Sequence, residues 1–178
     1  MINETLISAC KAKDRTAQRQ LYDLMATKLY HTCKRYLKQE HEIEEALADT
    51  FYTIFTKLDQ LKEVAAFEAW ARRVAVNFCL ATIRKKGNPT TYLEEMPQEP
   101  PMHFAAPKEL EEKDLLKLLE RLPDGCRMVF NLFVIEGYSH KEIAGMLQIT
   151  EGTSKSQLNF SKTKLKALVN QFYFLNEN

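Results

Sequence analysis

The sequence predicts an all-α protein made of two small helical domains joined by a flexible linker. Apolar residues recur at spacings of three and four, the period of a helix buried on one face, while alternating β-branched residues are almost absent. Glycine is scarce, with only 5 positions in 178. A proline-rich stretch near the middle interrupts the helical pattern, which leaves room for one domain on each side of it.

Several helices are expected in the first half of the chain. The earliest are marked by Leu6, Ile7, Ala17, Leu21, Leu24 and Leu29. A strong apolar stripe follows, formed by Ala46, Leu47, Thr50, Phe51, Ile54, Phe55 and Leu58. The last helix begins near Phe67 and ends in a basic run before Gly87, because basic residues in a last turn followed by glycine are ordinary stop signals. Residues 1–87 form the first predicted domain.

Residues 88–109 are predicted to be an acidic, proline-rich linker. The stretch GNPTTYLEEMPQEPPMHFAAPKELEEKD contains five of the 6 prolines and has no sustained apolar period. Proline removes both a hydrogen bond and the geometry that a helix needs. Between Glu94 and Glu112 there are six glutamates and one lysine. Helical pattern resumes at Leu115 and restarts after Pro123, so residues 110–178 form the second predicted domain.

Residues 138–160, YSHKEIAGMLQITEGTSKSQLNF, predict a helix-turn-helix. Ser139 lies three positions before Glu142, which is the pattern of a capping box that opens a helix. The inward face of this helix is formed by Ile143, Ala144 and Leu147. Thr150 is the expected cap of the next helix, and Gln148 stands at the turn position that glycine often occupies.

The second helix of this motif is basic. Between Gly152 and Asn170 it carries four lysines and no acidic residue. Polar side chains near its start can reach base edges in the major groove, and lysines can bind phosphates. The alternative is a helical hairpin inside an ordinary bundle, with the lysines as a solvated face.

Composition and charge exclude several classes of protein. With 25 basic and 24 acidic side chains the net charge is +1, so the chain is not a uniformly basic nucleic-acid binder, although patches of charge remain possible. No apolar run approaches the roughly 18 residues of a membrane span, and the N-terminus lacks a signal-peptide pattern. We therefore expect a cytoplasmic protein with no direct membrane insertion.

The cysteines and histidines indicate neither a metal site nor catalysis. The cysteines are widely scattered and form no C-x-x-C pair, so we expect buried or half-buried thiols at Cys10, Cys33, Cys79 and Cys126. The histidines show no metal-ligand spacing with them. A glycine-rich phosphate loop and a nucleophile–base spacing are also missing from the sequence. No enzymatic activity, small-molecule substrate, metal or cofactor is expected.

Two segments carry a family resemblance. The segment LLERLPDGCRMVFNLFVIEGYSHKEIAGMLQITEGTSKSQL contains Leu-Pro followed by Arg, then Ser-x-x-Glu-Ile-Ala and Gly-Thr-x-Lys-Ser. The segment HEIEEALADTFYTIFTKL precedes FEAWARRVAVNFCLATIRKK, with its Phe-x-x-Trp-x-x-x-Val-Ala-x-Asn pattern. In these motifs, and over nearly its whole length, the chain resembles the extracytoplasmic-function (ECF) sigma factors of bacterial RNA polymerase, the smallest members of the primary sigma family. The first domain resembles their region 2 and the second their region 4.

The resemblance implies a protein that binds core RNA polymerase, directs it to a promoter and helps to open the duplex. Region 4 is expected to read the −35 element of promoter DNA in the major groove. The residues implied for this contact are Ser139, Lys141, Thr153, Lys155, Ser156, Gln157, Asn159 and Lys162. Ser139 and Lys162 are expected to bind phosphates.

Region 2 is expected to hold the −10 element as a single strand. The residues implied are Lys62, Trp70, Arg72, Arg73, Asn77, Arg84 and Lys85. Asn77 ranks first, because it is a poor helix former in mid-helix without a packing role. Trp70 shares an apolar stripe with Phe67 and Val74, so core packing is an equal alternative to base stacking. Arg72 and Arg73 are alternatively plain surface charges.

The resemblance also implies two protein partners. Core polymerase is expected to dock on the acidic face of region 2, at Glu42, Glu45, Asp49 and Tyr52. An anti-sigma factor is the second expected partner, and the acidic linker would thread the polymerase near nascent RNA. A stand-alone helix-turn-helix regulator is the main rival hypothesis, but it needs no region 2 pattern.

Overall fold

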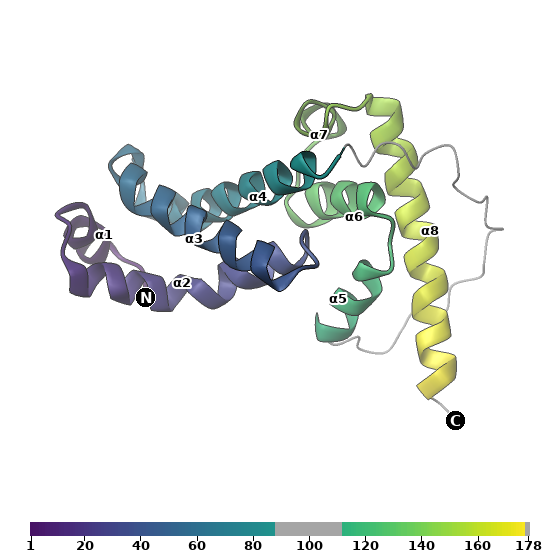
Figure 1. The fold of residues 1–178 in the computed structure, drawn as a ribbon, viewed down its shortest axis with the longest axis horizontal. Helices are drawn as coiled ribbons and strands as arrows, with labels where there is room; N and C mark the ends of the chain where they lie inside the picture. The colour runs from purple at the N-terminus through teal and green to yellow at the C-terminus, as the bar shows by residue number, and fades with distance from the viewer. Residues whose placement is uncertain (88–111, 177–178) are drawn as a thin grey trace. The chain divides into compact units, whose positions relative to one another are not determined.

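The chain divides into two compact units, Met1–Gly87 and Asn88–Asn178. The structure is a computed structural model that describes the backbone of residues 1–87 and 112–176 and the side chains of residues 1–87 and 114–171. Both units are helical, and the described residues contain no β-strand (Figure 1). The predicted all-α fold is confirmed. The predicted linker, residues 88–109, lies outside the described residues.

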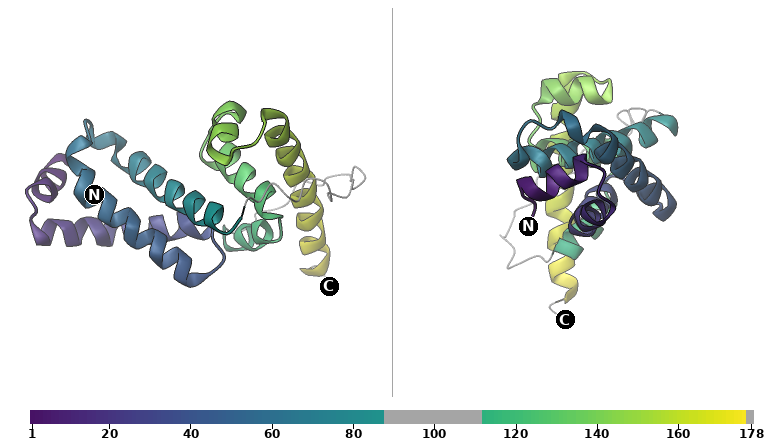
Figure 2. Two further views of the ribbon diagram at one scale, coloured as in Figure 1. Left: turned by 45° about the horizontal axis from the view of Figure 1, so that its top comes forward. Right: turned by 90° about the vertical axis from the view of Figure 1, so that its left-hand side faces the viewer.

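The first unit is a bundle of three long helices with a short helix before them. Its elements are α1 (Glu4–Lys11), α2 (Arg15–Lys34), α3 (Glu40–Lys57), the 3-10 turns η1 (Leu58–Gln60) and η2 (Val64–Ala66), and α4 (Phe67–Lys85). Within this unit α2, α3 and α4 pack against one another (Figure 2). Asn3 caps α1 through the Leu6 amide at 2.9 Å, and Asp14 caps α2 through the Ala17 amide at 2.8 Å.

The core of the first unit comes from one stripe on each long helix. Its buried apolar side chains include Leu21, Met25, Leu29 and Cys33 on α2, Ile43, Ala46, Phe51 and Ile54 on α3, and Phe67, Ala71, Ala75, Val76, Cys79 and Leu80 on α4. Fully burying a large apolar side chain stabilises a fold by roughly 1.5–3 kcal/mol. Polar residues therefore lie on the opposite faces of α3 and α4, where a partner can reach them.

The described part of the second unit contains four helices and one wider turn. These are α5 (Glu112–Glu120), α6 (Asp124–Phe130), the π-helical segment η4 (Asn131–Ile135), α7 (His140–Leu147) and α8 (Glu151–Asn176). Pro123 lies between α5 and α6, where the sequence predicts a break between two helices. The π-helical segment is not predicted, because one wider turn leaves the helical spacing of apolar residues almost unchanged.

A leucine-rich cluster holds α5 to the C-terminal half of α8. It consists of Leu118, Leu119, Leu122, Leu165, Leu168 and Val169, with Phe130 packed against it. Toward its N-terminus, α8 packs instead on α6 and α7. Among the described residues, no helix of either unit is both long enough and apolar enough to cross a membrane.

Candidate nucleic-acid interface

The second unit contains the predicted helix-turn-helix, in which a tight turn joins α7 to α8. Gln148 adopts the left-handed conformation at φ 56° and ψ 45°, and the Ile149 amide donates to the Ala144 carbonyl at 3.1 Å. Glycine is favoured at such a position because it has no Cβ, so Gln148 costs roughly 1 kcal/mol there. The Thr150 hydroxyl accepts from the Thr153 amide at 3.0 Å, which confirms its predicted capping role.

The predicted capping box opens α7. The Ser139 hydroxyl accepts from the Glu142 amide at 3.3 Å, and the Ser139 amide donates to Glu142 Oε2 at 2.8 Å. The Ser139 hydroxyl also donates to that carboxylate oxygen at 2.7 Å. Both donors of Ser139 are therefore engaged beside a negative charge that repels phosphate. The predicted phosphate contact of Ser139 stays a prediction, and Lys141 nearby is exposed.

The N-terminal half of α8 presents polar side chains to solvent. Lys155, Ser156, Asn159 and Lys162 are exposed, and Thr153 is half-buried in the first turn. The Ser156 hydroxyl donates to the Gly152 carbonyl at 3.0 Å, which leaves its oxygen lone pairs available to a donor from outside. These side chains are accessible to DNA, and their contacts stay predictions.

Gln157, one of the predicted −35 contacts, is buried. Its side chain is 3% exposed, between Ser154 and Ser161, which are both 0% exposed. Residues three and four apart share a helix face, so position 157 lies on the inward face of α8. Its Oε1 atom is buried without a hydrogen-bond partner among the described residues. Gln157 is therefore not accessible to a base edge in this structure.

His140 is a residue that the sequence prediction missed. It is the first residue of α7, and its ring stacks on Phe133 with centroids 4.5 Å apart and an interplanar angle of 22°. Its Nδ1 lies 2.8 Å from the Ser154 hydroxyl, so it joins α7 to α8. No spacing rule identifies such a pair, because the contact crosses a turn and depends on the orientation of two helices.

The exposed side of α4 carries most of the residues predicted to bind the −10 element. Arg73, Asn77 and Arg84 are exposed at helical spacings of four and seven, so they form one stripe. Lys85 is also exposed, and the Arg84 Nε donates to the Leu80 carbonyl at 3.3 Å. Basic groups on both sides of an amide are suited to holding a nucleotide strand.

Trp70 and Arg72 are half-buried and Lys62 is exposed in the segment before α4. The Trp70 ring lies 6.0 Å from the ring of Phe67, which is 0% exposed, at an interplanar angle of 53°. Trp70 thus packs on the core with one part of its surface and remains partly open to a ligand. Packing of Trp70 beside Phe67 is observed, and base stacking by its exposed part stays a prediction.

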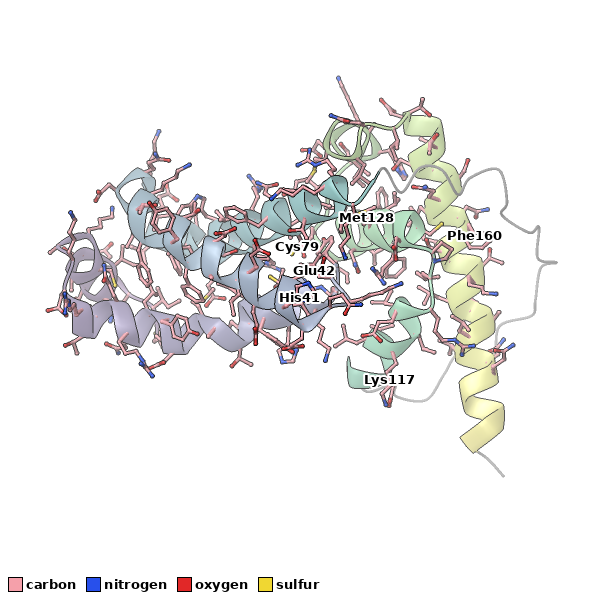
Figure 3. The ribbon with its side chains drawn as sticks, viewed as in Figure 1. His41, Glu42, Cys79, Lys117, Met128 and Phe160 are labelled. Atoms are coloured by element: carbon pink, nitrogen blue, oxygen red, sulfur yellow. The ribbon has the colours of Figure 1, made fainter. Side chains whose placement is uncertain are left out.

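The acidic face of α3 is narrower than predicted. Glu45, Asp49 and Tyr52 are exposed at positions i, i+4 and i+7, and Tyr52 is 72% exposed. Glu42, labelled in Figure 3, is only 6% exposed. It forms an ion pair with Lys86. Its carboxylate is therefore engaged within the first unit. The predicted contact of Glu42 with core polymerase stays a prediction, and Glu45 and Asp49 are the more exposed carboxylates of this face.

The predicted burial of the cysteines is confirmed, since Cys10, Cys33, Cys79 and Cys126 are all buried free thiols. Burial raises the pKa of Cys126 to about 11, although a hydrogen bond with Ser161 lowers it in part. A thiol–thiol hydrogen bond lowers the pKa of Cys33 and raises that of Cys79. The described residues contain no cluster of side chains suited to a metal ion.

Each unit matches a known protein family. Residues 21–88 match the family described as Sigma-70 region 2, and residues 112–165 match Sigma-70, region 4. The chain is 25% identical over 185 aligned residues to the ECF RNA polymerase sigma factor SigW of Bacillus subtilis (strain 168), covering 93% of this chain and 96% of that protein. The chain belongs to the ECF sigma factors.

A second relative of this ECF sigma factor is SigM of Mycobacterium tuberculosis (strain ATCC 35801 / TMC 107 / Erdman). It is 29% identical over 171 residues, which covers 94% of this chain and 84% of that protein. Both relatives are ECF RNA polymerase sigma factors. The matched ranges make α2, α3 and α4 region 2 of this ECF sigma factor, and α5 through the first half of α8 its region 4.

Two solved structures share the fold of the ECF sigma factor. CnrH in complex with the cytosolic domain of CnrY has a TM-score of 0.52 at 20% identity, covering 96% of this chain and 99% of CnrH. The sigma factor RpoE in complex with the anti-sigma factor NepR from Bartonella quintana also has a TM-score of 0.52, at 22% identity, covering 85% of this chain and 96% of RpoE.

Proposed function

We propose that this ECF sigma factor binds core RNA polymerase, recognises a promoter through its −35 and −10 elements, and helps to melt the duplex. The observation that carries this proposal is the exposed polar surface at the start of α8, Lys155, Ser156 and Asn159, in a helix-turn-helix of the sigma region 4 family. A second polar stripe lies on α4, in the separate region 2 unit.

Region 4 is proposed to read duplex DNA with α8. The major groove admits one α-helix, and each base pair presents its own pattern of donors and acceptors there. Ser156 and Asn159 offer groups that can pair with base edges, and Thr153 lies beside them in the first turn. Lys155 and Lys162, with Lys141 on α7, would neutralise phosphates and fix the register of the helix on the duplex.

Region 2 is proposed to capture the −10 element as an unpaired strand. Arg73, Arg84 and Lys85 would hold the backbone, with Arg72 and Lys62 contributing further positive charge. Asn77 has both a donor and an acceptor, so it can recognise a base that has lost its pairing partner. Trp70 has a partly exposed ring that can stack on such a base.

Core polymerase is proposed to dock on the exposed face of α3. Glu45 and Asp49 give this face its negative charge, and Tyr52 places an exposed aromatic ring beside them. Opposite charge on a partner accelerates specific encounter, and tyrosine is a frequent anchor of protein interfaces. A basic surface of the polymerase fits this chemistry.

An anti-sigma factor is proposed as a regulator of this protein. The proposal is supported by RpoE, which shares the fold and was solved in complex with the anti-sigma factor NepR. CnrH, of the same fold, was solved with the cytosolic domain of CnrY. A regulator that covers the polar surfaces of α3 or α8 would block the contacts proposed above.

Co-elution with bacterial core RNA polymerase, followed by transcription from a library of promoter fragments, tests the proposed function. We expect co-elution and start sites that share −35 and −10 sequences. The double charge reversal Glu45→Lys with Asp49→Lys should abolish co-elution. Arg19→Glu, on the exposed surface of α2 and outside the proposed docking face, should leave co-elution unchanged. If the protein binds duplex DNA but not core polymerase, the proposed function is wrong and a stand-alone helix-turn-helix regulator is the better hypothesis.

A further inference from the structure

The first turn of α8 is anchored by one buried side chain. Over residues 151–156, Ser154 is 0% exposed, whereas the other five residues are exposed or half-buried. The first buried leucine of the helix, Leu158, lies one turn further along. Lys155 and Ser156, two of the proposed DNA contacts, are next to Ser154 in the sequence. Ser154 is therefore the buried contact nearest to these two side chains within the first turn of α8.

The partner of Ser154 is His140. Its Nδ1 atom lies 2.8 Å from the Ser154 hydroxyl oxygen. A hydroxyl can donate to a neutral imidazole nitrogen or accept from a protonated one, so the bond is available in both states of the ring. The ring itself is held by its stack on Phe133 in η4, at 4.5 Å between centroids. His140 thus links η4, the start of α7 and the first turn of α8.

A second buried serine fixes α8 further along the same face. The Ser161 hydroxyl lies 2.8 Å from the Cys126 carbonyl of α6 and 2.7 Å from the Gln157 carbonyl of its own helix, so its one proton is shared between these two acceptors. Ser154 and Ser161 are two turns apart, and two points of attachment on one face define the direction of a helix. The partners of Ser161 belong to the backbone, whereas the partner of Ser154 is a side chain. The contact at the first turn of α8 therefore depends on the side chain at position 140.

We propose that His140 is a positioning residue for DNA recognition, which orients the start of α8 through its hydrogen bond to Ser154. This inference rests on the proposed function of α8 as the helix that reads duplex DNA. His140 is expected to touch no base, and to act only through the direction of α8. Without the bond the start of α8 populates several orientations, and only a fraction of molecules is competent to bind.

The expected loss of affinity follows from that fraction. Apparent affinity falls in proportion to the share of molecules in the competent orientation. A single hydrogen bond can bias such an equilibrium by about threefold to tenfold, the range that its typical free energy allows. The number of phosphates contacted should not change, so the dependence of affinity on salt should keep its slope.

Four variants separate positioning from stability. His140→Phe keeps a ring against Phe133 but loses the nitrogen, and His140→Asn keeps a polar atom near the Nδ1 position but loses the ring. Ser154→Ala removes the bond from the other side, which covers the case in which a position 140 variant fails to fold. Thr163→Ala is the matched control, because its hydroxyl donates within α8 to the Asn159 carbonyl at 3.1 Å.

The measurement is the affinity of each full-length variant for the duplex that the wild-type chain, alone or with core polymerase, selects from a random library. Fluorescence anisotropy gives the affinity, and circular dichroism gives the melting temperature. We expect His140→Phe and Ser154→Ala to bind about threefold to tenfold more weakly, and the double variant to be no worse than either. His140→Asn and Thr163→Ala should bind within about twofold of wild type, a change smaller than the loss of one hydrogen bond.

The stability ranking should differ from the affinity ranking. His140→Asn loses the ring stack and should melt below His140→Phe while binding DNA more tightly than it does. If His140→Phe and Ser154→Ala both bind with wild-type affinity, or if the affinities simply follow the melting temperatures, His140 is not a positioning residue. The proposed reading of duplex DNA by α8 would not be affected by that result. Failure of the wild-type chain to select any duplex, with or without core polymerase, would overturn the proposed reading of duplex DNA and this inference with it.

Discussion

Lys86, directly after the last residue of α4, forms an ion pair with Glu42 in the first turn of α3. The Glu42 side chain is 7% exposed and the Lys86 side chain 57% exposed. The pair ties the end of the helix proposed to bind the −10 element to the start of the helix proposed to bind core polymerase. Arg84, Lys85 and Lys86 are all exposed, but Lys86 is engaged in this ion pair with α3.

Glu42→Gln should destabilise the first unit by about 1–2 kcal/mol. The substitution replaces a charge-assisted contact with a neutral one and removes a negative charge from the N-terminal turn of α3. The sequence has one tryptophan, Trp70, and it lies in the first unit. Urea unfolding followed by tryptophan fluorescence therefore measures the free energy of unfolding of this unit alone.

Glu45→Gln is the matched control for that prediction. Glu45 lies on the same helix but is exposed, so its free energy of unfolding should change by less than about 0.5 kcal/mol. Its affinity for core polymerase should fall, whereas folded Glu42→Gln should bind polymerase like the wild type. If the two variants have the opposite effects, the assignment of one glutamate to structure and the other to docking is wrong.

Asn77→Ala should impair promoter opening without reducing stability. Asn77 is exposed in mid-helix, where alanine is the better helix former, so the first unit should be unchanged or slightly more stable. With core polymerase bound, permanganate reactivity of unpaired thymines around the −10 element measures opening. We expect a loss of about tenfold, since one well-placed amide pair discriminates bases by roughly 1–3 kcal/mol.

Gln20→Ala provides the comparison for Asn77→Ala. Gln20 is also an exposed amide inside a helix of the first unit, and it is not among the proposed contacts. Opening should therefore be unaffected by Gln20→Ala. A lower melting temperature of Asn77→Ala would show that the amide has a structural role and would remove Asn77 from the proposed site.

Local signals in the sequence predicted much of the fold. The capping box at Ser139 and Glu142 and the cap at Thr150 lie within three residues of their partners, so a short pattern contains them completely. The start of α4 at Phe67 and the break at Pro123 are likewise local. The two-domain sigma architecture needed more than this, because only the order of motifs along the whole chain identified it.

The candidate site was less predictable, because burial depends on helical phase and on distant partners. Gln157 and Asn159 look alike in the sequence, but position 157 lies on the inward face of α8 and position 159 on the outward face. Glu42 looks like its acidic neighbours until Lys86, from another helix, is placed beside it. The bond between His140 and Ser154 depends in the same way on a tertiary contact.

The second unit should lose stability in alkaline solution through Cys126. Burial raises its pKa from the ordinary 9.0 to about 11, so folding favours the neutral thiol. The resulting stabilisation is fully present below pH 9.0 and is lost as the pH rises through about 11. It is on the order of 2 kcal/mol, from the free energy that corresponds to such a shift.

Cys126→Ala provides the test of this pH dependence. In reducing buffer, the difference in free energy of unfolding between wild type and Cys126→Ala should shrink as the pH rises from 9 to 11. Far-UV circular dichroism follows the unfolding of both units, whereas fluorescence of Trp70 follows the first unit alone. A change in circular dichroism that has no counterpart in the fluorescence therefore reports unfolding of the second unit. A difference that stays constant across this range would mean that the thiol ionises as easily in the folded unit as in the unfolded chain.

Lys155→Ala should weaken duplex binding by the contribution of one phosphate contact. Lys155 is exposed beside the anchored Ser154, where its ammonium group is proposed to face the DNA backbone. Each phosphate contact that a protein makes adds about 0.9 to the slope of log affinity against log salt concentration, so this slope should fall by about one. Affinity should drop to a similar extent for every duplex sequence, because a phosphate contact carries no base information.

Lys117→Ala is the matched control for the charge itself. Lys117 is exposed on α5 of the same unit and lies 3.4 Å from Asp114, away from the helix-turn-helix in the sequence. Removing it changes the net charge of the protein equally, but it should leave the salt slope as in the wild type. Equal effects of the two substitutions would indicate that net charge alone drives binding. A change in sequence preference with Lys155→Ala would instead place this lysine on a base edge, as lysine can pair with guanine in the major groove.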